Sequence, residues 1–242
     1  MRFNFVGKVI LNDASSKVPY YKKIEGYDAH SFTLACAPTI NNRAFCEVAG
    51  FKYDKIKFYD NDGNEHEIDW DTRFDADNVK LARSKNVISF LDGTREEFIS
   101  AYDFVKFAAD NADKIRNKRF VITGSVKKNE YKGKITDRFT IQNMYEIEED
   151  DTRKNQLTVS GEFFFNKDSV DTSDFAKEHK IYLNGYTKET KDKKTVYMAK
   201  QVIMDCRKVD FENENHIARL NYQLMQIGLG LDDNNKVVNK LK

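Results

Sequence analysis

The chain has 242 residues, a length that fits one large domain or two small ones. Its 40 lysines and arginines nearly balance 39 aspartates and glutamates, and the net charge of +1 excludes both a uniformly basic chromatin-type protein and an acidic disordered chain. Hydrophobic residues at 40% and aromatic residues at 13% suffice for a core, which argues against intrinsic disorder.

The cysteine content of the sequence, and its lack of a signal peptide or membrane helix, indicate the cellular compartment. The first residues, MRFNFVGKVI, are interrupted by polar side chains and do not form a signal peptide. No stretch approaches the roughly 18–20 apolar residues of a membrane helix. The three cysteines, Cys36, Cys46 and Cys206, are an odd number without a close pair, which favours a reducing compartment. We expect a soluble cytoplasmic protein with no membrane partner.

The first half of the chain is expected to be mostly strands. Residues 3–11 predict a strand, and the polar stretch 12–30 predicts a long loop. The apolar runs 31–37 and 43–51 predict a hairpin. Residues 55–70 predict a second hairpin, because KIKFY and EHEIDW alternate on either side of the turn-rich DNDGN.

A helix is expected from about Thr94 to Arg116. Thr94 followed by Glu97 is typical of a capping box, and apolar residues then recur at helical spacing. The helix leads into RFVITGSVKK and KITDRFTIQNMYEI, which predict a further hairpin.

The acidic stretch 146–151, with five acids, predicts a domain boundary or linker. We therefore expect a nucleic-acid-binding domain over 1–150 and a second domain over 151–242. The second domain should contain a strand in QLTVSGEFFF, a hairpin in 180–204, a helix over about 214–229 and a loose tail.

The order of these elements predicts a mostly β fold with a few helices. The predicted order is three strands, a helix and two strands, which is the order of an OB-fold barrel, with an extra hairpin inserted before the helix. A general α+β sheet domain is the competing interpretation. The hairpin around Gly124 can be laid over the one around Gly185, which favours a duplicated module. The second, smaller OB-like unit is expected to be incomplete, since its final strands are not recognisable.

Enzymatic motifs are absent from the sequence. It holds no phosphate-binding loop, no dinucleotide fingerprint and no nucleophile elbow, and its four histidines lack a second ligand at metal-binding spacing. The strongest exception is the acidic run Asp69, Asp71, Asp75 and Asp77, which could hold Mg²⁺ for nuclease chemistry. Because its acids alternate with Ile68 and Trp70, a solvated strand face is favoured. We expect no catalytic residue, no metal site and no cofactor.

Basic residues cluster in three segments, 18–27, 127–134 and 187–194, and the first two also carry tyrosines. Between residues 118 and 138 there are seven basic and two acidic residues, and between 180 and 200 six and two. A binding site for single-stranded nucleic acid requires cationic side chains that replace the counterions of the phosphates, and aromatic rings on which the bases stack. The alternative is that lysine-rich turns only keep strand ends soluble. The predicted binding residues are Tyr20, Tyr21, Lys22, Lys23, Arg43, Lys127, Lys128, Tyr131, Lys132, Lys134, Arg138, Lys188, Lys193 and Lys194.

Two segments, FVITGSVKKNEYKGKITDRFTIQNMYEI and GEFFFNKDSVDTSDFAKEHKIYLNGYTKE, resemble bacteriophage single-stranded-DNA-binding proteins of the tandem OB-fold, replication-protein-A-like kind. The resemblance implies a non-enzymatic protein that coats single-stranded DNA during phage DNA replication or recombination in the host cell cytoplasm, with other replication proteins as further partners. It places Lys127, Lys128, Tyr131, Lys132 and Lys134 in the binding loop of the first barrel.

Two other functions stay open at this point. One is a Mg²⁺-dependent nuclease or other nucleic-acid-processing enzyme that uses the Asp69–Asp77 cluster. The other is a replisome or virion adaptor whose barrels bind another polypeptide.

Overall fold

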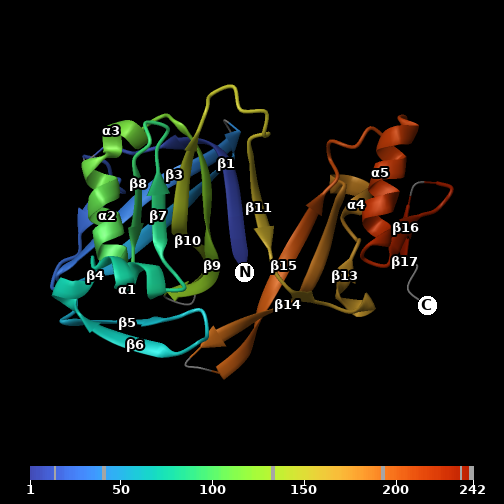
Figure 1. Cartoon of the computed structure of the whole chain (residues 1–242). Helices are drawn as coiled ribbons and strands as arrows, with labels where there is room; N and C mark the ends of the chain where they lie inside the picture. The colour runs from blue at the N-terminus through green and yellow to red at the C-terminus, as the bar shows by residue number, and fades with distance from the viewer. Residues whose placement is uncertain (14, 40–41, 132–133, 192–193, 235, 240–242) are drawn as a thin grey trace. The chain divides into compact units, whose positions relative to one another are not determined.

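The computed structural model describes residues 1–13, 15–39, 42–131, 134–191, 194–234 and 236–239. The chain forms two compact units, residues 1–160 and 161–242, and each is described by itself (Figure 1). The sequence places this boundary earlier, at residue 150.

The first unit contains a closed barrel inside a nine-stranded sheet. Its five strands are β1 (Arg2–Ile10), β3 (Ala29–Thr39), β4 (Asn42–Phe51), β9 (Arg119–Tyr131) and β10 (Lys134–Ile147). They pair in the cyclic order β1-β3-β4-β10-β9, and only the β4–β10 contact is parallel. This is a five-stranded OB-fold-like barrel, with its helix between the third and fourth strands, so the predicted fold class is confirmed.

The barrel core is aromatic and aliphatic. Phe5, Phe32, Phe120 and Ile122 are fully buried, together with Phe104 of the helix α2 (Ala101–Asp110). Each such side chain contributes roughly 1.5–3 kcal/mol by leaving water. The strand alternation that predicts these elements therefore also identifies their core-facing residues.

The predicted start of the helix at Thr94 is wrong. Residues 86–98 instead form a hairpin of β7 (Asn86–Ser89) and β8 (Arg95–Phe98), with Thr94 at the end of its turn. The turn forms because Asp92 accepts a hydrogen bond from the amide of Thr94 at 2.9 Å and Gly93 takes a φ of +90°. The helix N-cap is Ser100, whose hydroxyl accepts from the amide of Tyr102 at 3.1 Å. A further helical turn, α3 (Ala112–Ile115), follows α2.

Helix α2 approaches strand β4 closely at Gly50. A Cβ atom on Gly50 would lie 2.2 Å from the Cα of Tyr102, so any side chain there would displace the helix. The first turn of α2 is thus seated directly on the backbone of β4.

The segment inserted before the helix contains the predicted hairpin, β5 (Lys55–Tyr59) with β6 (Glu65–Asp69). A 3-10 turn (Trp70–Thr72) and α1 (Ala76–Leu81) follow. Arg73 ties this insertion to α2, because its guanidinium donates to both carboxylate oxygens of Asp103, at 2.7 and 3.2 Å. It also covers the ring of Trp70 at 4.0 Å. The predicted loop 12–30 contains one short strand, β2 (Tyr21–Lys23), which pairs with β3.

The segment predicted as a linker is bound to the barrel by one arginine. The buried guanidinium of Arg119 donates to the backbone carbonyls of residues 148, 149, 151 and 153, and to the side chain of Asn155, at 2.9–3.2 Å. The next residues form β11 (Gln156–Ser160), which pairs with β1. These contacts place residues 148–160 in the first unit.

The second unit is an antiparallel sheet on a long hairpin, β14 (Lys180–Lys191) with β15 (Lys194–Asp205). The short strands β12 (Phe163–Phe164) and β13 (Val170–Asp171) pair with β14. A 3-10 turn (Lys167–Ser169) lies between β12 and β13, and α4 (Phe175–Glu178) lies between β13 and the hairpin. Helix α5 (Glu214–Met225) ends before its predicted limit, and β16 (Leu229–Leu231) pairs with β17 (Val237–Asn239) in the predicted tail. A separate core holds this unit together, including Ile181, Leu183, Leu220 and Leu224.

Replacing Gly50 with Ala should destabilise the protein by about 1–3 kcal/mol, because the added methyl group meets the backbone of α2. The thermal midpoint and the urea midpoint of unfolding measure this. Ala49→Ser, on the opposite face of the same strand, is the control and should stay within about 0.5 kcal/mol of the parent. Equal midpoints for the Gly50 variant and the parent would contradict the close approach.

Candidate nucleic-acid interface

The outer surface of the barrel carries a basic and aromatic row at the junction of β4, β10 and β9. Buried Cys46 and Val48 alternate along β4 with residues that face outward, so Arg43 and Phe45 point away from the core. Cys46 pairs with Phe139 of β10, which sets Arg138 beside Phe45, and Arg138 pairs in turn with Lys127 of β9. We call Arg43, Phe45, Lys127 and Arg138 the barrel face.

Phe45 is the notable member of the barrel face, because 54% of it is exposed. An exposed phenylalanine in the middle of a sheet between cationic side chains has the form of a base-stacking site. Sequence analysis missed it by treating the run 43–51 as apolar strand. The strict alternation of that run with Cys46 and Val48 is the signal that could have identified it.

The cations of the barrel face differ in their surroundings. Arg43 and Lys127 are exposed. Arg138 forms an ion pair with Glu47, which lies on the same outer surface of β4. Lys128 has a largely covered side chain and pairs with Asp137 at 3.0 Å. Of the predicted lysine pair Lys127 and Lys128, the structure therefore exposes the first.

The predicted segment 18–27 divides into packed rings and exposed lysines. Tyr20 meets Phe32 edge to face, and Tyr21 stacks on His30 with its hydroxyl 2.8 Å from Nδ1. Both tyrosines pack against the barrel core. Lys22 and Lys23 are exposed, and Lys22 pairs with Ser31 on the outer surface of β3.

The remaining predicted residues fall into two groups. The side chains of Tyr131, Lys132, Lys134 and Lys193 lie outside the described residues. Lys188 and Lys194 are exposed on the hairpin of the second unit.

The acidic run Asp69–Asp77 is spread over the end of β6, the 3-10 turn and the start of α1. Within the part of the chain that the structure describes, no three His, Cys, Asp or Glu side chains converge as a metal site would require. In the hairpin turn, Asp60 instead accepts from Asn64 and lies 2.8 Å from Nε2 of His66. These partners hold the pKa of the Asp60 carboxyl well below its usual range.

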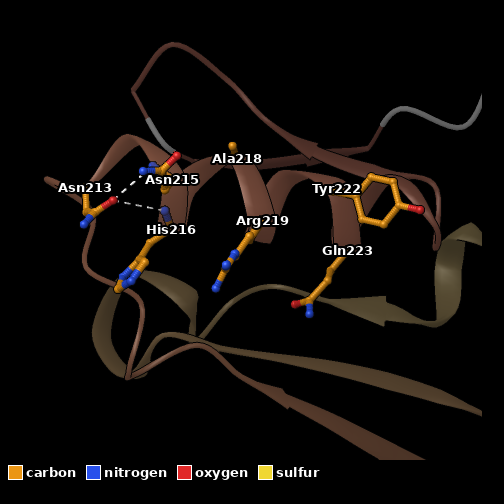
Figure 2. Close-up of a pocket in the computed structure, with 7 residues that line it drawn as sticks. All are labelled: Asn213, Asn215, His216, Ala218, Arg219, Tyr222 and Gln223. Atoms are coloured by element: carbon orange, nitrogen blue, oxygen red, sulfur yellow. Dashed lines mark hydrogen bonds between the residues drawn. The ribbon is translucent and has the colours of Figure 1, made fainter.

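A pocket of about 790 Å³ lies along α5 in the second unit (Figure 2). Asn213 caps the helix by accepting from the amides of Asn215 and His216; Arg219 extends from the next turn, and Tyr222 and Gln223 from the turn after it. The pocket is a mixed polar surface along one helix, and its side chains make no catalytic constellation.

Scans of family models, of curated proteins and of solved structures find no match to this chain. Among the described helices, none is long and apolar enough to cross a membrane.

His30 should make the first unit sensitive to pH. Burial lowers its pKa from the ordinary 6.5, and Lys106 adds to the effect. The unfolded chain therefore binds the proton more readily, and stability should fall as pH drops below about 6.5. Asp28 beside the ring opposes this shift. Thermal midpoints between about pH 7.5 and 5.5 should fall less steeply for His30→Gln than for the parent. Parallel curves would contradict a buried neutral His30.

Proposed function

We propose that this chain is a non-enzymatic single-stranded-DNA-binding protein, and that the barrel face is its first contact surface. The observation that carries the proposal is Phe45, a half-exposed ring on the outer surface of β4, with Arg43 two residues before it and Arg138 beside it on β10, next to Lys127 of β9. Coating of exposed single strands during phage DNA replication or recombination, the role that the resemblance implies, belongs to this proposal.

The position of the barrel face supports this function. OB-folds bind oligonucleotides on the face of their second and third strands and on the loops beside them. Here those strands are β3 and β4, and β4 carries Arg43 and Phe45 of the barrel face. Phe45 offers a surface on which any base can stack, and the cations suit phosphates. Lysine and arginine side chains that are not arranged as forks toward base edges favour binding with little sequence preference.

Removing the ring of Phe45 should weaken binding without changing its salt dependence. We expect Phe45→Ala to lose about 1–3 kcal/mol of affinity for a labelled oligothymidylate, whereas Phe45→Trp should retain binding. Phe74→Ala is the matched control, since Phe74 is 57% exposed elsewhere in the same unit. Fluorescence anisotropy titrations measure these affinities. Equal losses for the Phe45 and Phe74 variants would argue against the barrel face.

Removing the cationic side chains of the barrel face should instead change how steeply the affinity depends on salt concentration. Each phosphate contact contributes about −0.7 to the slope of log affinity against log salt. The double variant Arg43→Ala/Lys127→Ala should therefore make the slope less negative by up to about 1.4. An unchanged slope in titrations at four salt concentrations would remove these two residues from the contact surface.

Glu47 should limit binding, because it places a carboxylate on the same surface and pairs with Arg138. Glu47→Gln removes that charge and leaves Arg138 available to a phosphate. We expect tighter binding, by about two- to tenfold at low salt, with the gain shrinking as salt rises. Arg138→Gln should have the opposite effect. Weaker binding by the Glu47 variant, with an unchanged thermal midpoint, would contradict this role.

A further inference from the structure

The sheet formed by β12, β14 and β15 in the second unit exposes three aromatic rings on the side away from its core. Phe164, Tyr186 and Tyr197 are 44%, 54% and 58% exposed. Tyr186 pairs with Phe164 on one side, and the rings of Phe164 and Tyr197 meet edge to face at 5.6 Å. We call these three residues the aromatic face.

The alternation of β14 shows that this side is the solvent side of the sheet. Ile181, Leu183 and Thr187 are buried, whereas the intervening Tyr186 and Lys188 are exposed. Lys188 pairs with Tyr197 across the hairpin. The aromatic face thus has a lysine at its margin and lies opposite the core of the unit.

Lys188 and Tyr197 on the β14–β15 hairpin have counterparts in the barrel face on the β9–β10 hairpin. The two hairpins can be aligned on Gly124 of β9 and Gly185 of β14, since each glycine is buried on the first strand of its hairpin, three residues before an exposed lysine. Counting from these glycines, Lys188 corresponds to Lys127.

The residues opposite those two lysines also correspond. Lys127 pairs with Arg138, and Lys188 pairs with Tyr197. The second hairpin therefore presents a ring where the first presents a guanidinium.

A polar hollow adjoins the rings. It has a volume of about 490 Å³ and is lined by Asn184, Tyr186, Ala199, Gln201 and neighbouring side chains. The amide of Gln201 donates to that of Asn184 at 2.9 Å, which sets amide groups beside the Tyr186 ring. A planar base stacked on Tyr186 would find hydrogen-bonding groups at its edge.

The excess of basic residues around the aromatic face indicates which kind of ligand it binds. The sequence between residues 180 and 200 carries six basic and two acidic residues, which favours a polyanion. Exposed rings with amides and lysines beside them suit unpaired bases, since each base can use its face for stacking.

We propose that the aromatic face is a second binding surface for single-stranded nucleic acid, so that one chain holds a strand at two places. This inference rests on the proposed function. Two linked contacts on one strand raise affinity well beyond either alone, because the second contact forms at a high effective concentration.

The test uses the full chain and a labelled oligothymidylate of about 30 nucleotides, long enough for two contact surfaces of this size. The double variant Tyr186→Ala/Tyr197→Ala should bind it at least about tenfold more weakly. Tyr186→Phe/Tyr197→Phe should bind like the parent, because the rings remain. Tyr222→Ala is the control, since Tyr222 is 68% exposed on α5 of the same unit and lies off the aromatic face.

The outcomes separate this inference from the proposed function. Weakening by Phe45→Ala together with parent-like binding by Tyr186→Ala/Tyr197→Ala overturns the aromatic face and leaves the barrel face standing. Weakening by the tyrosine variant alone supports the aromatic face and overturns the barrel face. Parent affinity in both overturns both.

Ultraviolet cross-linking of the parent protein gives a readout independent of how the variants fold. Peptide mapping should find the oligonucleotide attached to a segment containing Tyr186 or Tyr197. Cross-links confined to the first unit would overturn the aromatic face.

Discussion

The first unit depends on a short parallel contact between β4 and β10. Two register pairs, Cys46 with Phe139 and Glu47 with Thr140, join the edges of the sheet and close the barrel. Gly124 makes room at the same level, since a side chain there would strike the carbonyl of Thr140. The ion pair of Arg138 and Glu47 crosses this contact on the outside. Closure therefore also creates the surface on which Phe45 lies beside Arg138, so the candidate site is a product of barrel closure.

Most of the strands follow from local pattern. Alternation and turn residues predict β1, the β3–β4 hairpin and the three later hairpins, because each depends on neighbours close in sequence. The helix start was misplaced because Asp92 and Gly93 favour a tight turn that outweighs the capping box at Thr94. The role of Arg119 could not be predicted, since its carbonyl partners lie about thirty residues away in a stretch that reads as a charged linker.

The candidate site was only partly predictable for a related reason. Composition identifies cations well, and Arg43, Lys127 and Lys188 are exposed as a binding role requires. It does not distinguish a ring that packs from one that is presented to solvent. Tyr20 and Tyr21 in the polar loop lie against the core, whereas Phe45 in an apolar strand is half exposed. Which side of a closed sheet a ring takes is decided by register, and register is set by pairing across the whole barrel.

The hydrogen bonds of Arg119 to the carbonyls of residues 148–153 affect how charge is distributed along the β9–β10 hairpin. Carbonyl oxygens accept the hydrogen bonds of this guanidinium, and the side chains of Glu148, Glu149 and Asp150 are left at the surface. The opposite end of the hairpin, about 40 Å away, leads into the lysine-rich turn. The hairpin is thus an electrostatic gradient from acidic to basic. A polyanion would be repelled at the acidic end and attracted at the basic end, so this charge distribution would orient a single strand on the contact surface proposed above.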